Sequence, residues 1–171
     1  MDILLLEKLV NMFLTDPGQY LRLDELAKEL KRSKLTLYKA LFYLEFSMLI
    51  RKILNYRPSI GAASRKPARI YPYHPCLTLP FNVPEERFAE NLVLFELNAR
   101  HYWRDGGKEI DFLKDLTPIE VKIKRKIEKE DLRWIKFFLK KYNAKKAYVI
   151  TKNVEDRIDA IHLNSAMAVL L

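Results

Sequence analysis

The sequence predicts a protein of the α+β and α/β classes, in which a helical N-terminal part precedes a part where helices and strands alternate. Apolar residues recur at three- and four-residue spacing through residues 3–14, as in an amphipathic helix. Prolines gather in residues 56–84, where little regular structure is expected. Because 171 residues suffice for one large or two small domains, we expect a domain over residues 1–75, a linker over 76–84 and a second domain over 85–171.

Residues 1–75 are expected to form three helices and a two-stranded ribbon. The stretch Asp16-Pro17-Gly18 ends the first helix, and Ser33 is a good N-cap for the third. The expected elements are helices over residues 3–14, 24–30 and 33–44, and strands over residues 49–54 and 69–71. This order predicts a winged helix-turn-helix, whose third helix can enter the major groove of DNA.

The charge balance makes nucleic acid, and DNA in particular, the first partner to consider. The chain carries 31 Lys and Arg against 22 Asp and Glu, a net charge of +9. No acidic residue lies between Phe46 and Pro84, so this stretch can rest on phosphates. The residues expected to contact nucleic acid are Lys34, Thr36, Lys39, Arg51, Lys52, Arg65, Lys66, Arg69, Lys124 and Arg125. A solvated basic loop, or a winged helix that only contacts proteins, is the alternative.

The composition excludes several classes of protein. The chain has four glycines and no GxxxxGK[ST] motif, so it is not a P-loop NTPase by itself. Its single cysteine, Cys76, excludes an intramolecular disulfide and a cysteine-based zinc site. No apolar run approaches the roughly 20 residues of a membrane helix, so we expect a cytoplasmic protein without a membrane partner. One glutamine and abundant lysine point toward a thermophile.

Residues 85–171 are expected to carry the reactive site. The expected elements are helices over residues 85–100 and 128–142, and strands over residues 102–104, 109–113, 118–123, 147–151 and 158–163. Because side chains alternate along a strand, Glu120 and Lys122 point the same way. Nine residues separate Asp111 from Glu120, enough for a strand, a turn and a strand that bring the two carboxylates side by side.

The predicted catalytic set is Glu90, Asp111, Glu120 and Lys122, and its three carboxylates are the predicted metal ligands. Hydrolysis of a phosphodiester requires a divalent cation that neutralises the phosphate and lowers the pKa of the attacking water. Mg²⁺, or Mn²⁺ in its place, prefers carboxylate oxygens and keeps several waters. Lys122 would orient the water and stabilise the developing charge. The alternative is that Glu120 and Lys122 form an ordinary ion pair on an exposed strand.

Four motifs occur in one order: Glu90-Asn91-Leu92-Val93, Tyr102-Trp103-Arg104, Gly-Lys-Glu-Ile-Asp-Phe over residues 107–112, and Pro-Ile-Glu-Val-Lys over residues 118–122. The set resembles the restriction-endonuclease-like, PD-(D/E)XK-type domain at the C-terminus of archaeal and bacterial AAA+ ATPases. Residues 37–45, 49–50 and 68–77 are similar to the winged helix and linker of that family.

The resemblance implies a restriction-endonuclease-like mixed sheet flanked by helices, and an AAA+ ATPase domain as partner in cis or in trans. It also implies that Asp111 and Glu120 ligate Mg²⁺, that Lys122 serves the nucleophile and that Glu90 assists the metal site. We therefore expect a DNA-acting, metal-dependent phosphodiesterase of the endonuclease kind, associated with an AAA+ ATPase. Two alternatives stay open: a catalytically inactive nuclease fold that binds or regulates an ATPase, and a winged-helix transcription regulator.

Overall fold

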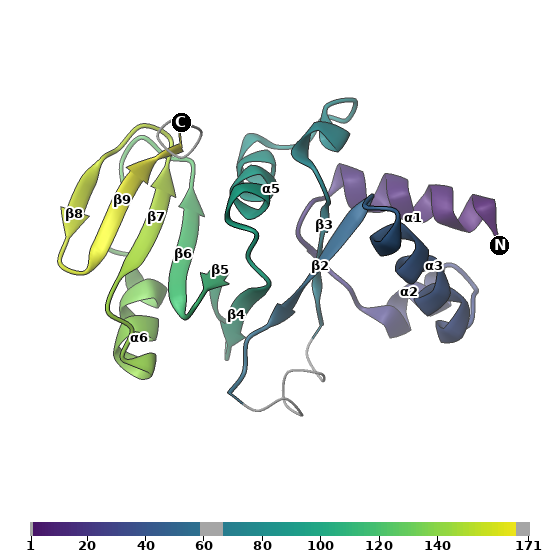
Figure 1. The fold of residues 1–171 in the computed structure, drawn as a ribbon, viewed down its shortest axis with the longest axis horizontal. Helices are drawn as coiled ribbons and strands as arrows, with labels where there is room; N and C mark the ends of the chain where they lie inside the picture. Colours follow the sequence, from purple (N-terminus) through teal and green to yellow (C-terminus); the bar gives the residue numbers. More distant parts are fainter. Residues whose placement is uncertain (1, 59–66, 167–171) are drawn as a thin grey trace.

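One mixed sheet runs through the molecule and links its two parts (Figure 1). The computed structural model describes residues 2–58 and 67–166, and its nine strands lie in the order β1-β3-β2-β4-β5-β6-β7-β9-β8. The N-terminal elements are α1 (Ile3–Thr15), β1 (Gln19–Tyr20), α2 (Leu23–Glu29), α3 (Lys34–Phe46), β2 (Ile50–Asn55), β3 (Arg69–Pro72) and the 3-10 turn η1 (Pro75–Thr78). The C-terminal elements are α5 (Glu85–Leu97), β4 (His101–Asp105), β5 (Lys108–Lys114), β6 (Thr117–Lys122), α6 (Arg133–Tyr142), β7 (Ala147–Thr151), β8 (Asp156–Ile158) and β9 (Ile161–Ser165). The predicted α+β class is confirmed.

Side-chain caps and a glycine turn define the ends of the N-terminal helices. The carboxylate of Asp2 accepts a hydrogen bond from the backbone N–H of Leu5 (3.1 Å), and the hydroxyl of Ser33 accepts one from that of Thr36 (3.1 Å). The predicted N-cap at Ser33 is therefore confirmed. After α1 the chain turns at Gly18, whose φ of +84° is a conformation that other residues rarely adopt. The turn brings β1 alongside β3.

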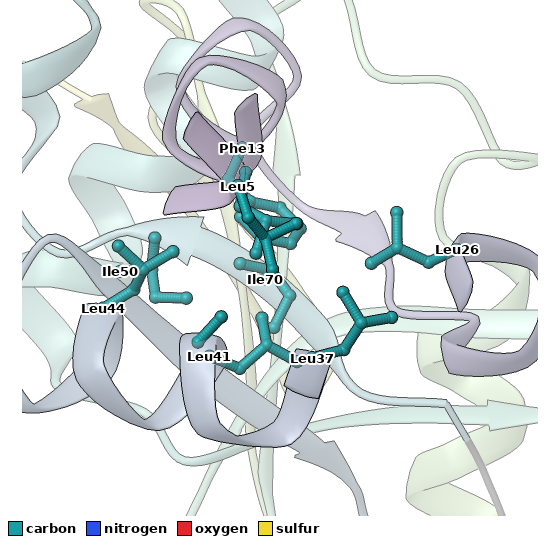
Figure 2. Packing of buried hydrophobic residues seen from close by; sticks show 10 residues of the cluster. Leu5, Phe13, Leu26, Leu37, Leu41, Leu44, Ile50 and Ile70 are labelled. Carbon is teal, nitrogen blue, oxygen red and sulfur yellow. The ribbon is translucent and has the colours of Figure 1, made fainter. Parts of the chain in front are cut away.

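The apolar faces of α1, α2 and α3 close over β2 and β3 (Figure 2). The buried residues of this cluster are Leu5, Leu9, Phe13, Leu26, Leu37, Ala40, Leu41, Leu44, Ile50 and Ile70. Their spacing along α1 and α3 is the helical spacing on which the sequence prediction rested. The element order expected for a winged helix-turn-helix is present, and the assignment to that fold family stays a prediction.

The sheet is continuous across the expected linker. Strand β2 pairs in parallel with β4, with Leu54 opposite His101 and Asn55 opposite Tyr102. The Asn55 side chain strengthens this junction, because it donates to the backbone carbonyl of Arg104 (3.1 Å) and accepts from the same residue's N–H (3.0 Å). Strands of the N-terminal part therefore lie beside those that carry the predicted site.

Helices α5 and α6 cover opposite faces of the C-terminal strands. Consecutive residues of β7 show this, since Val149 packs in the cluster that includes Ile135 of α6, and Ile150 packs in the cluster that includes Leu94 of α5. Among residues 2–58 and 67–166, no helix combines the length and apolar character needed to cross a bilayer.

Two predicted elements differ from the structure. The helix expected from residue 128 begins at Arg133, because residues 128–132 form turns in which Asp131 accepts a hydrogen bond from the N–H of Glu128 (3.0 Å). The strand expected over residues 158–163 is divided into β8 and β9 by a turn at Asp159, whose φ is +55°.

Candidate functional site

A bulge in β5 places Asp111 at the centre of the candidate site. Along β4 and β5, His101 pairs with Leu113, and Trp103 pairs with Ile110. Between these pairs, Tyr102 alone faces two residues of β5, Asp111 and Phe112. Such a bulge re-aims side chains and is common beside active sites. Phe112 then packs in the same cluster as Tyr71, on the α5 side of the sheet, and Asp111 contacts groups from that side as well.

Asp111 and Glu120 lie side by side on β5 and β6, as the sequence predicts. The ladder between the strands pairs Phe112 with Ile119, so Asp111 and Glu120 are the next residues along. There the side chains bond to backbone: Asp111 Oδ2 accepts from the N–H of Val121 (2.9 Å), and Glu120 Oε2 accepts from the N–H of Asp111 (3.3 Å). Both residues are 8% exposed, so two carboxylates share one nearly dry location.

Lys122 contacts the carboxylate of Glu120, with 2.8 Å between Lys122 Nζ and Glu120 Oε1. Burial raises the pKa of Glu120, and the charge of Asp111 raises it further, whereas Lys122 lowers it. Burial alone would lower the pKa of Lys122, but the charges of Glu120 and Asp111 raise it. The raised pKa of Lys122 reflects the negative charge of the two carboxylates, whereas the raised pKa of Glu120 reflects mainly its burial.

Glu90 reaches the site from α5 through a residue that the sequence did not single out for this role. The Arg69 guanidinium on β3 donates to Glu90 Oε2 (2.7 Å) and to Asp111 Oδ1 (3.4 Å). Tyr71 donates its hydroxyl to the same Glu90 oxygen (3.0 Å), and Arg87 approaches Glu90 Oε1 (3.4 Å). Burial and the charge of Asp111 raise the pKa of Glu90, and the two arginines oppose this shift.

Arg69 was predicted to contact nucleic acid, and the structure corrects this. The residue is 2% exposed, so its guanidinium is not available to a phosphate. Arg69 stands between the apolar residues Ala68 and Ile70, in a strand whose residues are all buried. A charged residue in such a strand indicates an internal ion pair.

The other residues expected on nucleic acid lie in three places. Arg51 is half-buried and donates to the carbonyl of Leu94 (3.2 Å) and the side chain of Asn98 (3.2 Å), so it joins β2 to α5. Arg65 and Lys66 lie outside the described residues. The remaining residues are on the surface or partly exposed, as follows: Lys34 and Thr36 near the start of α3, Lys39 on α3, Lys52 on β2, and Lys124 and Arg125 after β6.

The outer face of α3 is more apolar than a DNA-reading helix requires. Tyr38, Phe42 and Phe46 are 60%, 62% and 77% exposed, and the rings of Phe42 and Phe46 stack at 6.1 Å. Lys34 pairs with Asp24 on α2. Nothing in this arrangement tests DNA binding by α3, which stays a prediction.

The chemistry of the donors suits a hard divalent cation at Asp111 and Glu120. Mg²⁺ needs only one or two carboxylates because it keeps several waters. A cation held here would oppose the burial and the repulsion from Asp111 that together raise the pKa of Glu120. Among the described residues no group of three His, Cys, Asp or Glu side chains is arranged to hold a metal ion. The structure therefore brings together two of the three predicted ligands, while Glu90 faces Arg69 and Tyr71.

Comparison with known proteins gives one match. A family model described as "Domain of unknown function (DUF4143)" matches residues 86–166, from α5 to the end of β9. This domain is found at the C-terminus of AAA ATPases. The matched region includes the four predicted catalytic residues and excludes Arg69. No curated protein and no solved structure matches the chain.

Proposed function

We propose that the chain is a module of an AAA ATPase system whose Asp111, Glu120 and Lys122 cleave phosphodiester bonds of DNA with a divalent cation. The observation that carries the proposal is the pairing of β5 with β6, which sets Asp111 beside Glu120, with Lys122 at 2.8 Å from the second carboxylate. The match of residues 86–166 to a domain found at the C-terminus of AAA ATPases supports the association with an ATPase.

Each residue of the set has a separate task. When bound, Mg²⁺ supplies charge neutralisation of the phosphate and a more acidic water. Asp111 and Glu120 would hold the cation, because their carboxylates lie on neighbouring strands, each within hydrogen-bond distance of the other strand's backbone. Lys122 would turn its ammonium from Glu120 toward the phosphate, where it stabilises developing negative charge. We leave Glu90 out of the ligand set, because both its oxygens have cationic partners.

The surface next to the site suits a polyanion. Lys124 and Arg125 lie two and three positions after Lys122 and are exposed. Lys124 is paired with Asp131 (2.7 Å), while Lys126 and Lys129 add positive charge along the same exposed segment. Phosphate contacts of this kind position a strand without reading its sequence.

A second candidate function follows from one observation: each carboxylate of the site already has a cationic partner, Arg69 for Asp111 at 3.4 Å and Lys122 for Glu120 at 2.8 Å. If these ion pairs are the purpose of the residues, the fold serves as a non-catalytic module that binds or regulates an ATPase. Such a module needs no divalent cation.

Cleavage assays with matched variants test the proposal. Purified protein with Mg²⁺ or Mn²⁺ is incubated with supercoiled, linear, single-stranded and branched DNA, and the products are resolved on gels. We expect cleavage of at least one form, and its loss by about a hundredfold or more in Asp111→Asn and Lys122→Met. The exposed acid of the β5–β6 turn provides the control Asp115→Asn, which should cleave normally. Intact DNA throughout, together with no saturable Mn²⁺ binding, would contradict the proposal and favour the second candidate.

A further inference from the structure

We infer that Arg69 occupies the position of a second cation in the carboxylate site, so that the site takes one divalent ion and not two. This inference rests on the proposed function. Its basis is the number of acidic side chains and carbonyl oxygens that the Arg69 guanidinium contacts. Besides its contacts with Glu90 and Asp111, Arg69 Nη1 lies 3.5 Å from Glu109 Oε1, and its Nε donates to the carbonyl of Gly18 (2.8 Å).

The position of Arg69 is built into the fold. Its strand is held between β1 and β2, with Arg69 opposite Tyr20 on one side and Ile53 on the other. Gly18 leaves room for the guanidinium, because a Cβ there would lie 2.8 Å from Arg69 Nη2 and 2.8 Å from Tyr71 Oη. A cation fixed by the backbone in this way does not exchange with solvent ions.

The carboxylates divide into two sets on this basis. Glu90 is committed to Arg69, whereas Glu120 contacts Lys122 and is not a partner of Arg69 in the described ion pairs. Asp111 belongs to both sets, with Oδ1 toward Arg69 and Oδ2 on the backbone of β6. A divalent ion held by Asp111 and Glu120 would therefore share Asp111 with a fixed positive charge, the charge that the second ion of a two-metal site would otherwise supply.

Removing this charge should change metal binding in a defined way. Loss of one positive charge a few ångströms from a divalent ion should tighten binding by about tenfold or more. It also frees Glu90 and Asp111 to accept a second ion. Titration calorimetry with Mn²⁺, and electron paramagnetic resonance of free Mn²⁺, report stoichiometry and affinity without any assay of cleavage.

We expect the wild-type chain to bind one Mn²⁺. We expect Arg69→Met to bind either two Mn²⁺ ions, or one Mn²⁺ at least about tenfold more tightly than the wild type does. The control Arg57→Met removes a partly buried arginine that pairs with Asp105, away from the carboxylate site, and should bind as the wild type does. If Arg69→Met does not fold, the comparison is made between Glu90→Gln and Glu90→Gln/Arg69→Met. The double variant should then bind Mn²⁺ more tightly than Glu90→Gln does.

The outcomes separate this inference from the proposed function. One ion in the wild type, with unchanged affinity and stoichiometry on removal of Arg69, overturns the inference alone. Binding only after Arg69 is removed supports the inference and overturns the metal-dependent function of the wild type. No binding in any folded variant overturns both.

Discussion

Arg69→Met should destabilise the protein strongly, because it removes the buried cation shared by Glu90 and Asp111 and leaves only the more exposed Arg87 beside Glu90. Arg69 is 2% exposed, its partner Glu90 is 6% exposed, and 2.7 Å separates Arg69 Nη2 from Glu90 Oε2. Removing one partner of a buried pair costs about 3–5 kcal/mol. At roughly 2–4 °C per kcal/mol for a chain of this size, the melting temperature should fall by about 6–20 °C.

The dependence of this loss on pH identifies its cause. Burial and Asp111 already raise the pKa of Glu90, and loss of Arg69 removes an opposing charge and raises it further. A carboxyl whose pKa is higher in the folded than in the unfolded protein contributes stability below the unfolded value, and loses it as pH rises through the folded value. The gap in melting temperature between wild type and variant should therefore be widest at alkaline pH and narrow on acidification.

Circular dichroism melts from mildly acidic to alkaline pH measure both effects. The control Arg57→Met breaks a more exposed pair, 3.2 Å from Asp105, and should cost about 1 kcal/mol. The variant Glu90→Gln/Arg69→Met should recover part of the loss, because a neutral amide replaces the buried carboxylate that has lost its buried partner. A melting temperature of Arg69→Met that matches the control, or a gap that does not change with pH, would refute the electrostatic explanation.

Three further predictions concern the same cluster. Gly18→Ala should lower the free energy of unfolding by about 1–3 kcal/mol in urea titrations, because the backbone has positive φ and the new Cβ would meet Arg69 and Tyr71. Its control is Gly106→Ala, where φ is also positive but a Cβ would meet no other atom, so the loss of stability should be smaller. Tyr71→Phe should cost about 1–2 kcal/mol, since it removes the hydroxyl that donates to a buried carboxylate at 3.0 Å; a loss below the error of the melts would contradict this. Mn²⁺ binding should release protons and tighten as pH rises, because the pKa of Glu120 is raised in the free protein; equal binding enthalpies in buffers of different ionisation enthalpy would show that no proton leaves.

The sequence was sufficient for features that depend on local spacing. The cap at Ser33 and the hairpin that brings Asp111 to Glu120 follow from residues close together in the chain. The register between these two carboxylates needs only a strand, a tight turn and a second strand. The same locality explains why both residues were identified from the sequence.

The sequence was insufficient for features that depend on distant segments. Arg69 lies 42 positions from Asp111, and their contact requires the parallel pairing of β2 with β4, which no local pattern specifies. The bulge at Asp111 and Phe112 is a mismatch between two strands and leaves no mark in either one alone. The basic character of Arg69 therefore predicted a phosphate contact, while its burial depends on the complete sheet.

The charge of the cluster also determines the order in which ligands can enter it. The carboxylates in ion pairs with Arg69 or Lys122 are Glu90, Glu109, Asp111 and Glu120. Arg87 and Arg104 add positive charge only at the more exposed edge, where 39% and 42% of their side chains are accessible. Glu109 also lies at that edge, with 34% of its side chain accessible. The two inner cations therefore face three inner carboxylates, which leaves the interior negative when all three are ionised, and a phosphate would be repelled there. Under the proposed function, a divalent cation must therefore enter before or with DNA, and without it the basic segment after Lys122 would hold DNA only outside the site.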